Sequence, residues 1–311
     1  MAIVSIPPEA LLEDATHDSR FVEHHRDWCL HLEAGDILLF PKTPVKIPAE
    51  DLDFLLSQHQ AASGLHKNIA YKPGKDLLTG IDSKSMPPQA IERLHSILRA
   101  YSLAVTDFLH GFLAPYQARW ELDYASFRPV EEQGRDLPLH RRNDLLHTDA
   151  FPTRPTQGAR ILRFFNNINP TRTRDWIVGD PFGEIVGTYA PREIPLPHPK
   201  SLAVQTLDSL GRALGLSRIL PAIQRSPYDE FMLRFHNFLK ENSVYQATCA
   251  KTHIEFPPGS SWMVYTDTVP HAVLSGQFAV EQTFLVSPEA QLDRSSSPVA
   301  ILERMTGSRL R

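Results

Sequence analysis

The feature that most limits the fold of this chain is the change in the spacing of apolar residues after Pro115. Before it, the segment from Pro87 to Pro115 keeps apolar residues on one side over many turns, which predicts a long amphipathic helix. After it, apolar and polar residues alternate in short stretches, as in half-buried strands. These stretches are Arg119–Pro129, Ala159–Asn169, Thr252–Phe256, Ser261–Asp267 and Gln277–Ser287. Short strands separated by proline and glycine predict a mostly antiparallel sandwich or jelly-roll barrel.

Further helices are expected on either side of the first of these strands. Leucines at one-face spacing predict a helix at Ala49–Ala62, and Gly35–Phe40 has the composition of a short strand in an otherwise irregular N-terminal region. The segment Ser226–Gln246 is amphipathic, and we expect its apolar face to pack against the sheet.

The order of these elements predicts a single domain over residues 1–311, mostly β with flanking helices. Residues 1–115 would form a mainly helical N-terminal support. Residues 116–290 would form the jelly-roll core, with a helical insertion at about 200–246.

The composition excludes several classes of protein. An apolar fraction of 42% and a charged fraction of 22% are typical of a globular domain, and a net charge of −4 gives no basic field for nucleic acid. No run of about 18 apolar residues is present, and the N-terminus lacks the charged and apolar regions of a signal peptide. We therefore expect a cytoplasmic protein.

The stretch "LLHTDAFPTRP" (Leu145–Pro155) carries a histidine and an aspartate two residues apart. In an extended backbone, His147 and Asp149 lie on the same face and can occupy adjacent positions around a metal, although a polar strand end is an equal alternative. A third ligand is needed. His271 is the first candidate, because it lies at the edge of a hairpin late in the jelly roll, and His253 is the second.

Two histidines and a carboxylate are the facial triad of non-haem Fe(II) oxygenases, but a catalytic zinc also takes three protein ligands. An oxygenase that uses 2-oxoglutarate also needs a cation for the far carboxylate of that co-substrate. From His271 to Asp293 the chain contains no Arg or Lys. We therefore assign this role to Arg163, which shares a strand face with apolar residues, and expect neutral hydrogen bonds from Gln282 and Thr283. Arg160, on the opposite face, is expected to be solvated.

Several long blocks around these residues are similar to a known family. The blocks are "HKNIAYKP", "ASFRPVEEQGRDLP", "RNDLLHTDAFPTRPTQGARILRFFNNINPT" and "WMVYTDTVPHAVLSGQFAVEQTF". Together they resemble the bacterial hydroxylases of 3-deoxy-D-manno-oct-2-ulosonic acid (Kdo), a sugar acid of lipopolysaccharide. The resemblance implies a double-stranded β-helix of the jelly-roll, cupin-like type. It also implies an Fe(II) enzyme with 2-oxoglutarate and O₂ as co-substrates, and His147, Asp149 and His271 as the iron ligands.

The resemblance also implies a substrate, namely lipid-A-linked Kdo, whose outer sugar would be hydroxylated at C3. Seven arginines against three aspartates lie between His140 and Asp175, which suits an anionic substrate. The candidate substrate contacts are Arg128, Arg160, Trp176, Lys67 and Lys72. Such a substrate implies peripheral contact with the cytoplasmic face of the inner membrane.

Two alternatives remain open at this point. One is a related oxygenase that acts on another anionic small molecule or lipid. The other is a non-catalytic jelly-roll module that binds a sugar acid, in which the histidines serve only the structure.

Overall fold

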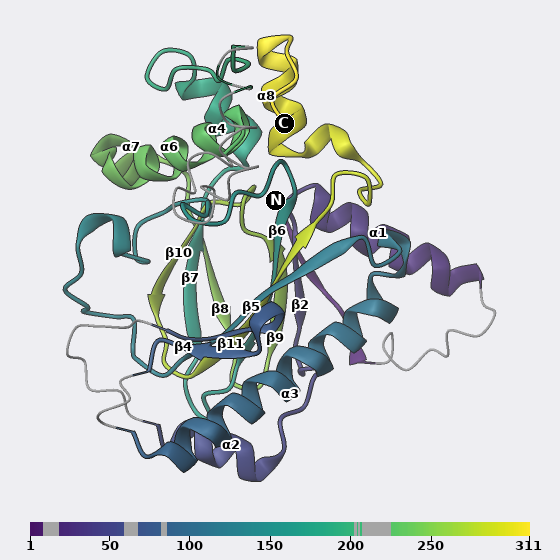
Figure 1. Ribbon diagram of the computed structural model, residues 1–311, viewed down its shortest axis with the longest axis vertical. Helices are drawn as coiled ribbons and strands as arrows, with labels where there is room; N and C mark the ends of the chain where they lie inside the picture. The colour runs from purple at the N-terminus through teal and green to yellow at the C-terminus, as the bar shows by residue number, and fades with distance from the viewer. Residues whose placement is uncertain (9–18, 59–67, 82–85, 202–203, 205, 207–224) are drawn as a thin grey trace.

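The computed structural model describes the chain except for residues 9–18, 59–67, 82–85, 202–203, 205 and 207–224 (Figure 1). Two sheets face each other. The larger sheet has the strand order β1-β2-β9-β6-β11-β5-β3-β4, and the smaller has the order β10-β7-β8. The strands of the larger sheet are β1 (Ile3–Ser5), β2 (Ile37–Phe40), β3 (Ile69–Lys72), β4 (Leu77–Thr79), β5 (Trp120–Arg128), β6 (Arg160–Asn167), β9 (Ser261–Tyr265) and β11 (Ala279–Val286). Those of the smaller sheet are β7 (Arg174–Val178), β8 (Thr252–Phe256) and β10 (His271–Ser275).

The alternating pattern of the central strands gives the larger sheet two buried faces. On β6, Leu162 and Phe164 pack in the cluster that includes apolar residues of the long helix α3 (Pro88–Phe112), which crosses the outside of the sheet (Figure 1). Phe165 points the other way and joins Trp176 and Phe256 of the smaller sheet. An isolated antiparallel bridge between His147 and His271 extends the smaller sheet beyond β10. This arrangement is the double-stranded β-helix expected from the sequence, and that prediction is confirmed.

The N-terminal region contributes more strand than was expected. Helices α1 (Ser19–Glu33) and α2 (Ala49–Leu56) accompany α3, but β1 to β4 also come from the first 115 residues. β2 pairs with β9 through Leu38 and Met263, and β3 pairs with β5 through Ala70 and Ser126. The N-terminal region therefore supplies strands to the core sheet at both of its edges in addition to the expected helices. Helix α1 falls in the region that was expected to be irregular.

The helical insertion forms a cap at one end of the sheets, together with the C-terminal helix (Figure 1). Its described helices are α4 (Phe182–Tyr189), α6 (Pro227–Glu241) and α7 (Ser243–Thr248), and α8 (Pro298–Thr306) lies beside α4. Apolar residues of α4, α6 and α8 form one cluster with Leu146 and with Ala272 of β10. The apolar face of α6 therefore packs mainly on other helices rather than on the sheet.

Helix α6 is held in a fixed position beside the His-x-Asp stretch. Ser226 and Asp229 form a capping box at its N-terminus. The Asp229 carboxylate also accepts hydrogen bonds from the backbone N–H groups of Thr156, at 2.8 Å, and Gln157, at 3.1 Å. Because these residues follow Asp149 in the same loop, the helix and the His-x-Asp stretch are joined as one unit.

Candidate metal centre

The structure brings His147, Asp149 and His271 together at the end of the smaller sheet. His147 and His271 lie opposite each other in the isolated bridge, with backbone N–H to carbonyl distances of 3.2 and 2.9 Å. The backbone N–H of Asp149 donates to the carbonyl of Thr266 at 2.8 Å, which fixes the third residue. One side-chain ligand atom from each of the three lies within 4.8 Å of the others.

The two imidazoles are oriented for metal binding by their other ring nitrogen. Nδ1 of His147 lies 2.7 Å from the carbonyl oxygen of Leu145, and Nδ1 of His271 lies 2.9 Å from that of Val269. A carbonyl only accepts, so Nδ1 carries the hydrogen and Nε2 keeps its lone pair. The indole of Trp176 stacks on the His271 ring at 5.1 Å between centroids, which fixes the ring plane.

The charge states also fit a divalent cation. Burial lowers the pKa of both His147 and His271, so both rings are neutral at physiological pH. Burial alone would raise the pKa of Asp149, but the nearby positive groups, Arg163 first, outweigh it and bring the pKa below its usual value. Two neutral imidazoles and an ionised carboxylate are the donor set of the non-haem Fe(II) triad.

The second candidate for the third ligand lies elsewhere. His253 is on β8 and is grouped with Asp175 and Glu255 in an exposed cluster on the smaller sheet. It does not line the cavity next to His147. The structure therefore favours His271 over His253.

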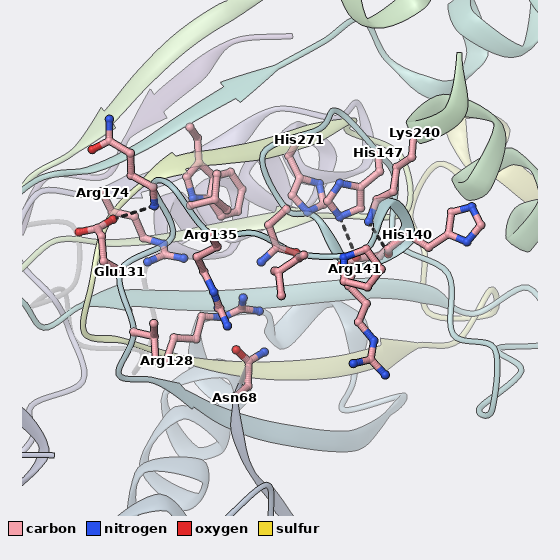
Figure 2. Close-up of a pocket in the computed structure, with 18 of the residues that line it drawn as sticks. Asn68, Arg128, Glu131, Arg135, His140, Arg141, His147, Arg174, Lys240 and His271 are labelled. Atoms are coloured by element: carbon pink, nitrogen blue, oxygen red, sulfur yellow. Dashed lines mark hydrogen bonds and ion pairs between the residues drawn. The ribbon is translucent and has the colours of Figure 1, made fainter. Parts of the chain in front are cut away.

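The three ligands open into a cavity of about 990 Å³ (Figure 2). Its walls come from the loop of residues 130–141, from the inner faces of both sheets and from helix α6. Most of its charged side chains are basic. The basic side chains are those of Arg128, Arg135, Arg141, Arg163, Arg174 and Lys240.

A chain of buried ion pairs leads from the metal ligands along this cavity. Nε of Arg163 lies 3.0 Å from the Asp149 carboxylate, and its Nη1 lies 3.2 Å from Glu281 on β11. Glu281 is also bound by Arg128 at 2.9 Å. Farther on, Glu132 lies 3.7 Å from Arg128 and 3.8 Å from Arg174. Arg163 is therefore already placed between two carboxylates.

The far end of this chain places two buried guanidinium groups, those of Arg128 and Arg174, beside the same carboxylate of Glu132. Burial and the neighbouring charge of Arg128 lower the pKa of Arg174 to about 10, despite the opposing effect of Glu132. The Nε–H groups of Arg128 and Arg174 are buried and have no hydrogen-bond partner. Buried Nε–H donors without a partner are suited to an anion, which would accept hydrogen bonds from them.

Several residues predicted from the sequence lie outside the cavity. Arg160 is fully buried rather than solvated, with its Nε 3.2 Å from Asp267 and its guanidinium over the Tyr265 ring, which corrects both predictions made for it. The Gln282 amide donates to the backbone oxygens of Asp123 and Thr283, at 2.9 Å each, and neither Gln282 nor Thr283 lines the cavity.

Of the remaining candidates for substrate contact, some line the cavity and others do not. Lys72 lies over the ring of Tyr124 outside the cavity, and Lys67 lies outside the described residues. Arg128 and Trp176 do line it. Trp176 is only 1% exposed and packs against other aromatic rings as well as against His271, so it is part of the core.

Sequence reasoning missed Glu281, which pairs with Arg163 behind the cavity wall, and two residues of the cavity itself, His236 and Lys240. The last two lie four residues apart on α6, a spacing that puts them on one helical face, so this signal was present in the sequence. His236 contacts the His147 ring edge to face, at 5.1 Å between centroids.

Comparison with known proteins identifies the family. The model of the 3-deoxy-D-manno-oct-2-ulosonic acid (Kdo) hydroxylase family matches residues 15–309. This chain belongs to the Kdo hydroxylase family. No curated protein sequence matches the chain significantly.

Solved structures of the Kdo hydroxylase KdoO, a non-haem Fe(II) α-ketoglutarate-dependent dioxygenase, are similar to this chain over almost their full length. The complex with α-ketoglutarate (2-oxoglutarate) and Fe(III) is 31% identical, with 100% of this chain and 97% of that chain covered and a TM-score of 0.80. The cobalt(II) complex is 32% identical, with 99% and 97% covered and a TM-score of 0.81.

The expected enzyme class is therefore confirmed: this Kdo hydroxylase is a non-haem Fe(II) and 2-oxoglutarate-dependent dioxygenase. The zinc alternative and the non-catalytic alternative are set aside. Among the residues that the structure describes, no helix is both long and apolar enough to cross a membrane.

Proposed function

We propose that this enzyme hydroxylates C3 of the outer Kdo sugar of lipid-A-linked Kdo, at an iron centre held by His147, Asp149 and His271. The observation that carries the proposal is the position of this donor set, which opens into a cavity lined mainly by basic side chains. A sugar acid on phosphorylated lipid A is strongly anionic, so the charge of the cavity matches the substrate.

When bound, Fe(II) with 2-oxoglutarate and dioxygen supplies the oxidising power for replacing C–H by C–OH, and 2-oxoglutarate leaves as succinate and CO₂. The chain itself orients and isolates the reactants. The carbonyls of Leu145 and Val269 hold the two imidazoles in the tautomer that presents Nε2, and Arg163 keeps Asp149 ionised. The closely packed Trp176 and Phe165 line the inner wall, which keeps bulk water from that side.

For the far carboxylate of 2-oxoglutarate we assign Arg128 and Arg174 in place of Arg163. Arg163 lies 3.0 Å from the metal ligand Asp149 and 3.2 Å from Glu281, so an additional anion there would meet the charge of a metal ligand, whereas the carboxylate paired with Arg174, that of Glu132, lies 3.8 Å away. Arg128 and Arg174 keep buried Nε–H groups without partners. An arginine fork of this kind binds a carboxylate with charge-assisted hydrogen bonds.

The lipid part of the substrate implies peripheral contact with the cytoplasmic face of the inner membrane. In this proposal the sugar enters the cavity past the loop of residues 130–141, where Arg135 and Arg141 lie. Both side chains are suited to the phosphate and carboxylate groups that surround the Kdo sugars.

Mass spectrometry tests the substrate assignment. Kdo-bearing lipid A incubated with the Fe(II) protein, 2-oxoglutarate and air should gain one oxygen atom, located on C3 of the outer sugar by fragmentation. An unchanged lipid together with steady 2-oxoglutarate consumption would instead favour an oxygenase of another anionic substrate.

A further inference from the structure

The cavity has a second basic region on the opposite side of the metal ligands from Arg128 and Arg174. Figure 2 shows Lys240 beside His147, with His140 and Arg141 below it, while Arg128 and Arg174 lie at the other end of the view. Lys240 belongs to the last turn of α6, and the capping box and the Asp229 contacts hold this helix in place. The fold therefore fixes the point on the helix from which the Lys240 side chain extends into the cavity.

Lys240 is a buried cation with incomplete hydrogen bonding. The residue is 4% exposed, and its Nζ donates to the backbone carbonyl of His140 at 3.0 Å. Among the residues that the structure describes, it forms no ion pair with a carboxylate. An ammonium group has three donors, and a buried charge without a counter-ion is costly.

Its electrostatic surroundings agree with this description. Burial lowers the pKa of Lys240 to about 8, although the more distant Asp149 and Asp144 act in the opposite direction. A bound iron would neutralise Asp149 and leave the ammonium even less balanced. An anion beside Nζ would offset this cost.

The reaction provides such an anion. It brings two carboxylate-bearing molecules into one cavity, 2-oxoglutarate and the sugar acid, and the arginine region accounts for only the first. In Kdo the carboxyl carbon C1 and the methylene carbon C3 are both bonded to C2. A cation that holds the sugar carboxylate close to the metal ligands therefore also positions C3 there.

We propose that Lys240 is the specificity-determining residue for the sugar acid, with its ammonium group bound to the carboxylate of the Kdo unit that is hydroxylated. This inference rests on the proposed function, and it assigns the two carboxylates of the reaction to two separate basic regions of the cavity. The sugar then lies between helix α6 and the iron ligands.

A cycle of protein and substrate changes tests this pairing. The substrates are Kdo-bearing lipid A and the same lipid with its sugar carboxylates converted to carboxamides. Lys240→Met removes the charge and keeps an unbranched side chain, and it should raise the KM for the acid by about 10- to 100-fold, the value of one charge-assisted hydrogen bond. The same change should leave the KM for the carboxamide nearly unaltered.

Three controls separate substrate binding from structure. Lys251→Met, on an exposed lysine outside the cavity, should change neither KM. Lys240→Arg should keep the preference for the acid. Anaerobic titration of each variant with Fe(II) and 2-oxoglutarate should give affinities close to those of the wild type, which shows that the iron and co-substrate sites are intact.

The outcomes distinguish this inference from the proposed function. Equal losses on the acid and the carboxamide would overturn the role of Lys240 and leave it as a tether for the loop at His140. Absence of hydroxylation of both lipids by the wild-type enzyme would refute the proposed function itself, and this inference with it. If Lys240→Met does not fold, Lys240→Gln takes its place, because its amide can still donate to the His140 carbonyl.

Discussion

Nε of Arg163 lies 3.0 Å from the carboxylate of Asp149, so the most central arginine of the cavity contacts a metal ligand. Its other side contacts Glu281 at 3.2 Å. In the proposed assignment, the residue that the sequence favoured for the co-substrate supports the iron site instead. We therefore expect replacement of Arg163 to affect iron binding, and replacement of Arg174 to affect the binding of 2-oxoglutarate.

Replacement of Arg163 should weaken the metal site more than the co-substrate site. Arg163→Met removes the positive charge that keeps Asp149 ionised, and loss of a group that supports a ligand typically lowers metal affinity by about 10- to 100-fold. Anaerobic titration of Fe(II) into the purified variant measures this. A wild-type iron affinity together with a strongly raised KM for 2-oxoglutarate would return Arg163 to the co-substrate role.

Replacement of Arg174 should have the opposite pattern. Arg174→Met removes one of the two guanidinium groups assigned to 2-oxoglutarate, and we expect the KM for this co-substrate to rise by about 10- to 100-fold. The iron affinity should stay close to that of the wild type. Arg172→Met, on a mostly exposed neighbour outside the cavity, is the matched control and should change neither quantity. An unchanged KM for 2-oxoglutarate in Arg174→Met would contradict the assignment.

Metal binding should stabilise the folded protein through His271 and not through His253. Anaerobic addition of cobalt(II) at about 100 times its Kd should raise the free energy of unfolding of the wild type by about 2.7 kcal/mol. His271→Ala should lose this effect, and His253→Ala should keep it, because His253 is not part of the buried triad. Thermal unfolding with and without cobalt checks both variants. Loss of the stabilisation in His253→Ala alone would reverse the ligand assignment.

The buried carboxyl of Glu33, at the end of α1, predicts a pH dependence of stability. Burial raises its pKa, and the backbone N–H groups of Asp293 and Leu292 offset only part of the shift. Because the folded pKa lies above the unfolded one, this contribution to stability is fully present below the unfolded pKa and is lost as the pH rises through the folded pKa. The free energy of unfolding of Glu33→Gln, relative to wild type, should therefore increase as the pH rises from roughly 5 to 8.

Denaturant unfolding at several pH values in this range measures the Glu33 effect. Glu289→Gln is the control, because the pKa of Glu289 is lowered by a backbone hydrogen bond and by Arg311, and its contribution is lost only as the pH falls. A pH-independent difference between Glu33→Gln and the wild type would contradict the account.

The sequence predicted those strands whose apolar and polar residues alternate within the segment itself. Alternation predicted β5, β6, β9 and β11, and it also placed Arg163 on the inner face of β6. Strand β7 was missed because it directly follows a run of polar residues and proline that is typical of a loop. Its position depends on pairing with β8 and β10, which are distant in the sequence.

The sequence predicted which side chains lie on which face of a strand or helix. It did not predict the partners that these side chains find on distant elements. The alternation of side chains along β6 correctly placed Arg160 on the opposite face from Arg163. It does not show which residues pack against that face. Asp267 and Tyr265 do so, and they turn an expected surface cation into a buried ion pair. Likewise, the spacing of His236 and Lys240 defines a helical face, while the direction of that face follows from the contacts of Asp229 with the loop after Asp149.

The most direct test of the central claim is the fate of molecular oxygen. Wild-type enzyme supplied with Fe(II), 2-oxoglutarate, Kdo-bearing lipid A and isotopically heavy dioxygen should place one heavy oxygen atom on C3 of the outer sugar and form one succinate for each sugar hydroxylated. Asp149→Ala should give neither product. Succinate formation without heavy oxygen in the sugar, or labelling that survives in Asp149→Ala, would contradict hydroxylation of Kdo at this iron centre.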